Sequence, residues 1–292
     1  MANITMAEHK SKKTKRVHKP GHVLKELLVL LIVVVGIIPL VWVVFLSLKS
    51  NTEIFSNPLS FPEEVQWINY KAAFEKIPWG KMLKNTFTEM AIGLPVGMIF
   101  SFLSSFAIAR IRFGNDKWND AFYTYFLAGI IIPSFVLLFP VYQLVEKIGL
   151  YDNIIAMSLV HISWCAPMNT VIMVNAFRGI PNELEEAAVI DGCGIWKLLC
   201  EIYLPLIKST LVTIFILSFI GIWNDFVLAK TLMISNEHST ISMAASLFRG
   251  LYASDYASMT AAIVILIVPQ LIVFATMQKQ IVDGITAGAV KG

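Results

Sequence analysis

The chain has 292 residues, of which 57% are hydrophobic and only 15% charged, and its mean hydropathy is +0.69. A soluble domain carries about 25% charged residues because its surface faces water, so this composition excludes an ordinary soluble globular protein. A helix crosses a hydrocarbon core of about 30 Å with about 20 residues. The length therefore allows six membrane-spanning helices with moderate loops, and leaves little room for a separate soluble domain.

The cysteines argue against a disulfide framework and against a zinc site. Cys165, Cys193 and Cys200 form no repeating spacing and are odd in number, whereas such frameworks use paired, regularly spaced cysteines. We interpret them as small buried or cytosolic thiols. No metal site and no catalytic residue is expected in this chain.

The N-terminal region joins a basic stretch to an apolar run. Residues 1–22 hold six Lys and Arg side chains and almost nothing apolar, which predicts a disordered cytoplasmic tail. The apolar run at 27–46 is longer than the core of about 7–15 residues in a signal peptide, and no Ala-x-Ala cleavage pattern follows it. We therefore interpret it as an uncleaved first membrane helix.

Residues 23–292 are predicted to form one all-α integral membrane domain with six transmembrane helices. The expected spans are residues 24–48, 85–109, 119–142, 154–177, 209–229 and 257–277. Pro133 and Pro140 fall inside the third span, and membrane helices tolerate proline where neighbours satisfy the freed carbonyls, so we expect kinks there. In the second span, Gly93, Pro95 and Gly97 are expected to permit close helix packing.

The distribution of Lys and Arg predicts the orientation of the chain. With the N-terminus in the cytoplasm, the inward-facing segments carry fifteen of these residues and the outward-facing segments carry eight. Positive charge accumulates on the cytoplasmic side of membrane proteins. Both termini are therefore expected in the cytoplasm, with the loops at 49–84 and 230–256 outside.

The polar loop at 178–208 between the fourth and fifth spans is predicted to be helical. Pro181 suits the first turn of a helix, and the acidic residues that follow it complement the positive end of the helix dipole. Gly192 is expected to end this helix with a positive φ, and a second short helix can follow as far as Pro205. A helix lying on the membrane surface is the alternative, but such helices are usually rich in Lys and Arg.

Three motifs in this half of the chain resemble a known family. Glu186-Ala187-Ala188-x-x-Asp191-Gly192, followed after nine residues by Ile202-x-Leu204-Pro205, resembles the "EAA" loop of ABC importer permeases. The stretch at 223–226, Trp-Asn-Asp-Phe, and the ending at 280–292 resemble the carbohydrate, or maltose-type, permeases of that superfamily. The resemblance covers residues 24–292.

The resemblance implies a type I ABC importer permease in a bacterial cell membrane. It implies a second permease subunit, which we expect to form a heterodimer with this chain, a dimer of cytosolic ABC ATPases, and an extracellular solute-binding protein. The chain lacks the Gly-x-x-x-x-Gly-Lys-Ser/Thr phosphate loop, so ATP and Mg²⁺ are expected on the ATPase and no cofactor on this chain. Lipid is an expected contact and nucleic acid is not. The residues expected to couple the chain to the ATPase are Glu186, Ala187, Ala188, Asp191, Gly192, Leu204 and Pro205.

Polar residues inside the predicted spans mark a candidate path for the solute, because such residues are costly in lipid and usually face the bundle interior or a water-filled cavity. For His161 an interhelical hydrogen bond is the alternative, and for Trp223 and Asp225 it is a position at the membrane interface. Ala187 and Ala188, by contrast, are expected to face outward on the ATPase-docking surface. The candidate solute-path residues are Trp223, Asn224, Asp225, His161, Trp164 and Asn169.

Several other functions remain open at this stage. An ion-coupled secondary transporter would need buried carboxylates at mid-membrane, often with an inverted repeat, but Glu89 and Asp225 are predicted towards the ends of their spans. An intramembrane enzyme would need a motif such as His-Glu-x-x-His, which the chain lacks. A permease for another small solute is a further alternative. The sequence favours import of a sugar, as a di- or oligosaccharide, without identifying it.

Overall fold

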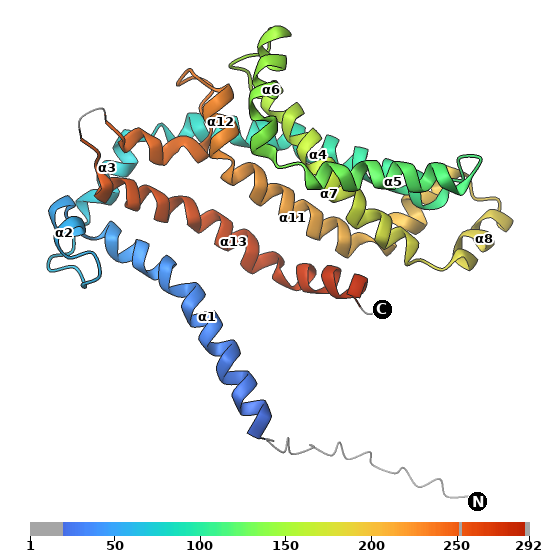
Figure 1. Ribbon diagram of the computed structural model, residues 1–292, viewed down its shortest axis with the longest axis horizontal. Helices are drawn as coiled ribbons and strands as arrows, with labels where there is room; N and C mark the ends of the chain where they lie inside the picture. The colour runs from blue at the N-terminus through green and yellow to red at the C-terminus, as the bar shows by residue number, and fades with distance from the viewer. Residues whose placement is uncertain (1–19, 251–252, 290–292) are drawn as a thin grey trace, which may run out of the picture.

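The computed structural model describes residues 20–250 and 253–289, and the regular secondary structure in this part of the chain is helical apart from one isolated bridge between Arg249 and Ser254. The all-α class predicted from the sequence is therefore confirmed. Most of the predicted basic tail, residues 1–19, lies outside the described residues. Figure 1 shows that most of the long helices run roughly along the long axis of the molecule.

Within the described residues, four helices are long and apolar enough to cross a membrane. They are α1 (Pro20–Ser47), α4 (Trp79–Arg110), α7 (Ile154–Arg178) and α13 (Tyr256–Ala289), in which the apolar stretches are Leu24–Ser47, Trp79–Arg110, Ile154–Arg178 and Tyr256–Lys279. Two bent helix pairs bring the number to six if each pair is one span. The remaining short elements are α2 (Asn51–Ser56), α3 (Ile68–Lys76), α8 (Asn182–Ile190), α9 (Ile195–Lys197), η1 (Leu198–Tyr203), α10 (Leu204–Leu206), α12 (Phe226–Leu232) and η2 (Ile241–Phe248).

The predicted third span is broken rather than kinked. It consists of α5 (Asp116–Ile131) and α6 (Ser134–Lys147), which meet at an angle of 97°. Pro133 causes the break, because proline lacks an N–H and forces the preceding residue away from the helical conformation. Ile132 accordingly has φ −74° and ψ 117°. Pro140 lies inside α6 without ending it.

The predicted fifth span at 209–229 is also interrupted. The helix α11 (Lys208–Asn224) ends at Asp225, which has φ −75° and ψ 85°, and α12 starts at the next residue. At its other end, α11 meets the Ile195–Leu206 segment at 76°. The prediction of one continuous span over 209–229 was therefore wrong. The helix α11 ends within the Trp-Asn-Asp-Phe motif.

The core of the bundle is the contact between α4 and α7. An added Cβ at Gly93 would lie 3.7 Å from the Ser158 carbonyl oxygen, and one at Gly97 would lie 3.8 Å from Ile162 Cα. These distances are ordinary van der Waals contact, so a longer side chain at either position would push the helices apart. The close packing predicted for this pair of glycines is confirmed, as small residues at membrane helix interfaces allow backbones to approach.

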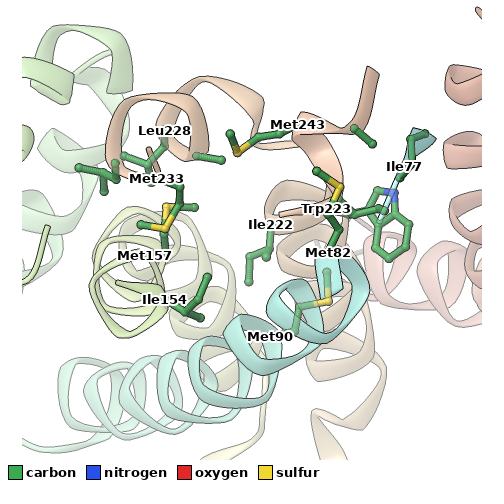
Figure 2. Packing of buried hydrophobic residues seen from close by; sticks show 14 of the residues in the cluster. Ile77, Met82, Met90, Ile154, Met157, Ile222, Trp223, Leu228, Met233 and Met243 are labelled. Atoms are coloured by element: carbon green, nitrogen blue, oxygen red, sulfur yellow. The ribbon is translucent and has the colours of Figure 1, made fainter. Parts of the chain in front are cut away.

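Towards the end that carries α2 and α3, methionines fill the space between α4, α7, α12 and η2. Figure 2 shows Met82, Met90, Met157, Met233 and Met243 around one buried cluster, and all five are buried. The unbranched thioether side chain adapts to irregular gaps. These residues fix α12 and η2 against the bundle and so support the break at 225.

The two ends of the long axis differ in what they carry. In Figure 1, α2 and α3 lie at one end and α8 lies at the opposite end, while α1 leans away from the other helices. The loop between α12 and η2 is held at the end that carries α2 and α3. Asn85 donates to the carbonyls of Glu237 and Ser239, and Lys81 pairs with Glu237 at 2.6 Å.

Candidate functional site

The loop between α7 and α11 contains the helix that the sequence predicted. The helix α8 begins directly after Pro181, with Glu183 and Glu185 in its first turn, where they complement the helix dipole. Gly192 has φ +75°, and its N–H donates to the Val189 carbonyl at 3.0 Å. The predicted positive φ at Gly192 is confirmed, and the turn leads into α9.

The two alanines of the loop differ in exposure, although they are adjacent on α8. Ala187 is exposed, as expected for a docking surface. Ala188 is only 7% exposed and packs in a cluster with Phe106, Met173 and Phe177. The expectation that Ala188 faces outward was therefore wrong: its small side chain lets α8 lie close to the ends of α4 and α7.

The outward side of the loop is apolar as well as acidic. Ile190 is 84% exposed and Trp196 69% exposed, and Val189 and Ile195 are also exposed. Such exposed apolar groups mark interaction surfaces. The other predicted coupling residues lie at the surface of the same loop: Glu186, Asp191, Leu204 and Pro205. We call the surface formed by Ala187, Val189, Ile190, Ile195 and Trp196 the docking surface.

At the other candidate site, His161 bridges two carboxylates from different helices. His161 Nδ1 lies 2.5 Å from Glu89 Oε1 on α4, and His161 Nε2 lies 2.9 Å from Asp225 Oδ2. The imidazole and the Glu89 carboxylate are both buried. Both ring nitrogens face carboxylate oxygens, so this arrangement needs either an imidazolium or a protonated carboxyl group. We call these three residues the acid–histidine triad.

Asp225 also holds the helix that follows it. Its Oδ1 accepts a hydrogen bond from the Leu228 backbone N–H at 3.0 Å, which caps α12, while its Oδ2 faces His161. Both carboxylate oxygens are therefore engaged within the chain. His161 makes the interhelical contact that the sequence left open as one of its two alternatives.

Glu89 is the functional residue that the sequence interpretation missed. The helix α4 starts at Trp79, six residues before the predicted start at 85, so Glu89 lies deeper in the helix than expected and is 1% exposed. The prediction that Glu89 lies towards the end of its span was wrong for this reason. The sequence did contain an indication that Glu89 faces α7, because Glu89, Gly93 and Gly97 are spaced four residues apart and share the helix face that meets α7.

Two of the predicted solute-path residues serve packing instead. Trp223 is 3% exposed, donates from Nε1 to the Leu266 carbonyl and stacks on Phe219 with ring centroids 5.8 Å apart. Its side chain therefore faces the protein interior rather than lipid or an open path. Asn169 is buried and donates to Ser218 Oγ at 3.1 Å.

The other predicted residues line one pocket of about 340 Å³ between α6, α7, α11 and α12. His161, Trp164, Asn224 and Asp225 are among its lining residues, and the rest are mostly apolar. The volume is at the lower end of the range for small-molecule sites, about 300–1,000 Å³. Beside it, the amides of Asn224 and Gln270 pair reciprocally, with N–O distances of 2.8 and 3.1 Å.

The described residues contain no group of three or more His, Cys, Asp or Glu side chains arranged to hold a metal ion. The triad instead has the chemistry of a buried charge network, which is a common mark of function inside membranes.

Comparison with known proteins identifies the family of the chain. Residues 93–286 match the family described as binding-protein-dependent transport system inner membrane component. The chain belongs to this family. It is a membrane transport subunit, and its fold is that of an importer permease.

Individual relatives agree with this assignment along most of the chain. The sulfoquinovosyl glycerol transport system permease protein of Agrobacterium fabrum is 30% identical over 90% of this chain and 91% of its own length. The diacetylchitobiose uptake system permease protein NgcG of Streptomyces coelicolor is 29% identical over 87% of this chain and 84% of its own. In a bacterial ABC transporter that imports the acidic polysaccharide alginate, one chain superposes with a TM-score of 0.73 at 20% identity, covering 92% and 99% of the two chains.

Proposed function

We propose that this permease translocates a sugar, a di- or oligosaccharide, which a separate binding protein delivers on the outer side. The observation that carries the proposal is the 340 Å³ pocket at the break between α11 and α12, where Trp164 and Asn224 stand beside the triad. An aromatic face stacks on a sugar ring, and an amide both donates to and accepts from hydroxyl groups. The names of the two curated relatives, which transport sugar derivatives, support this class of solute.

The partners follow from the surfaces that the chain leaves open. The docking surface on α8 and α9 receives a cytosolic ATPase, one of two that bind ATP and Mg²⁺. Exposed apolar side chains along α1, such as Leu31 and Ile32, fit lipid and a second permease subunit, which forms a heterodimer with this chain. The solute leaves the binding protein at the end that carries α2 and α3.

Within the pocket, the residues have different roles. Asp225 and His161 hold α12 and α4 in place, because their polar atoms are engaged with one another and with the backbone. Trp164 and Asn224, together with Gln270, are the groups that contact the sugar. An approaching hydroxyl can replace one hydrogen bond of the Asn224–Gln270 pair.

Removal of the amide pair is expected to impair transport without disturbing assembly. Asn224→Ala combined with Gln270→Ala should lower sugar uptake several-fold at unchanged membrane levels, because Asn224 is exposed and the pair is not part of the buried core. Uptake of radiolabelled diacetylchitobiose, melibiose and sulfoquinovosyl glycerol by cells that express the whole importer identifies the solute and measures the effect. Thr276→Ala on α13 is the matched control, since its hydroxyl bonds only to carbonyls of its own helix among the described residues. Normal uptake by the double variant would contradict these roles.

The proposed orientation places both termini in the cytoplasm and the loops at 49–84 and 230–256 outside. In a background without native cysteines, Glu64→Cys and Asn236→Cys should react with a membrane-impermeant maleimide in intact cells. Both positions are exposed. Lys117→Cys should react only after the cells are opened. Labelling of Lys117→Cys in intact cells would overturn the orientation.

A further inference from the structure

Arg110, the last residue of α4, links the docking loop to the bundle. Its Nη2 donates to the backbone carbonyls of Phe177 and Ile180, and its Nη1 donates to Asn182 Oδ1. Phe177 lies in the last turn of α7 and Asn182 is the first residue of α8. One side chain therefore joins α4 to the end of α7, to the turn beyond it and to α8.

A second set of contacts extends the link to η1. Arg110 Nη1 lies 3.8 Å from Glu185 Oε2 on α8, and Tyr203 Oη donates to this same oxygen at 2.5 Å. The Arg110 guanidinium also lies 5.5 Å from the centroid of the Tyr203 ring. Below it, Phe106, Phe177 and Tyr203 pack edge to face, with centroid distances of 5.3–5.9 Å.

Arginine suits this position for physical reasons. The last carbonyls of a helix have no partner within the helix and carry partial negative charge, so a cation at the end of α7 is stabilised. The guanidinium offers five N–H donors in a planar fork and keeps its charge when buried. The side chain of Arg110 is only 6% exposed, so its contacts are shielded from water.

We propose that Arg110 is a positioning residue for transport, which makes α8, the end of α7 and α4 move as one rigid body when the ATPase shifts the docking surface. This inference rests on the proposed coupling function of the loop. The movement of α8 then passes along α4. This helix also carries Glu89 of the triad, 21 residues from Arg110, or about 32 Å along a helix at 1.5 Å per residue. A displacement of α8 therefore reaches the acid–histidine triad through a single helix.

Spin labels on the complete, purified importer test the proposal without knowledge of the solute. In a background without native cysteines, one pair joins Leu103→Cys on α4 to Leu184→Cys on α8, outside the docking surface, and a second joins Leu184→Cys to Phe274→Cys on α13. All three positions are exposed. Distances are measured by pulsed electron paramagnetic resonance without nucleotide and after trapping with ATP and vanadate. In the otherwise unaltered protein the 103–184 distance should stay narrow and constant, while the 184–274 distance should shift.

Substitutions of Arg110 test whether this side chain links α8 to α4. Arg110→Ala should broaden the 103–184 distribution and remove the nucleotide-dependent shift of the 184–274 distance. Arg110→Lys keeps the charge, but the lysine side chain cannot reach all the acceptors. It should therefore broaden the distance distribution between α4 and α8 to a smaller degree. Arg110→Lys serves as the deciding variant if Arg110→Ala is not produced. Arg112→Ala is the control. Arg110 and Arg112 both line a surface pocket of about 780 Å³, but Arg112 makes no hydrogen bond or ion pair with the described residues.

Two results would overturn the inference in distinguishable ways. If Arg110→Lys and Arg110→Ala both behave like the unaltered protein, Arg110 is not the link, although the docking function stands. If ATP and vanadate change neither distance in the unaltered importer, or if the ATPase is not retained by it, the proposed coupling function fails as well.

Discussion

Gly192→Val is expected to abolish sugar uptake while the protein is still inserted in the membrane at normal levels. Gly192 has φ +75°, a conformation that a β-branched side chain adopts only with strain. The backbone around it must change, and this change tilts α8 against α9 and divides the docking surface. Because Gly192 is exposed and an added Cβ meets no atom within 4 Å, the packing of the bundle itself should be unaffected.

The neighbouring glycine provides a matched control for this effect. An added Cβ meets no atom within 4 Å at either Gly192 or Gly194, so steric exclusion is the same at both positions. Gly194 has φ −73° and ψ 162°, which valine adopts readily. Gly194→Val should therefore retain uptake and co-purify with the ATPase, whereas Gly192→Val should lose both. Equal behaviour of the two variants would exclude the turn at Gly192 as the cause.

His161→Leu is expected to cause the largest loss of stability of any single substitution in the bundle. The apolar side chain leaves the buried Glu89 carboxyl group and the partly buried Asp225 carboxyl group without the imidazole that bridges them. Removal of one partner from a buried charge pair costs about 3–5 kcal/mol. The capping contact of Asp225 on α12 should loosen with it. The unfolding temperature of the purified subunit in detergent, followed by tryptophan fluorescence, should fall clearly.

An uncharged variant of the triad separates the effect of an unpaired buried charge from the effect of a changed side-chain shape. The triple variant Glu89→Gln, His161→Gln, Asp225→Asn keeps hydrogen-bonding groups at all three positions but removes every charge. Replacing a buried ionic cluster with uncharged groups is often neutral for stability, so most of the lost unfolding temperature should return. If His161→Leu alone is as stable as the unaltered protein, the triad does not hold the helices together.

The sequence predicted the features that depend on composition and on local conformation. The helical class, the close approach at Gly93 and Gly97 and the positive φ at Gly192 follow from residue type and nearby neighbours. The break at Pro133 was predicted in place but not in size. Proline fixes where a helix is interrupted, whereas the packing of the two halves decides how far they turn.

The errors concern which face of a helix is turned inward. In an apolar span both faces are hydrophobic, so periodicity does not distinguish the lipid side from the core, and Trp223 was assigned to a path although it packs in the core. Ala188 faces the bundle because α4 and α7 end beneath it, which sequence spacing does not show. The triad joins residues that are 72 and 64 positions apart, so only the fold brings them together.

The broken pair α5 and α6 has a consequence for water. Helices of 16 and 14 residues extend only about 24 and 21 Å at 1.5 Å per residue, and each is shorter than the hydrocarbon core of about 30 Å. If the pair crosses the membrane once, the irregular backbone at 132–133 lies at a depth where lipid offers no hydrogen bonds. Such backbone is tolerated where it lines a hydrated cavity or is covered by protein. Ser134 and Phe135, at the start of α6, line the 340 Å³ pocket, so the interrupted backbone of this span borders the pocket rather than lipid alone, and water in the pocket would supply the hydrogen bonds that lipid cannot.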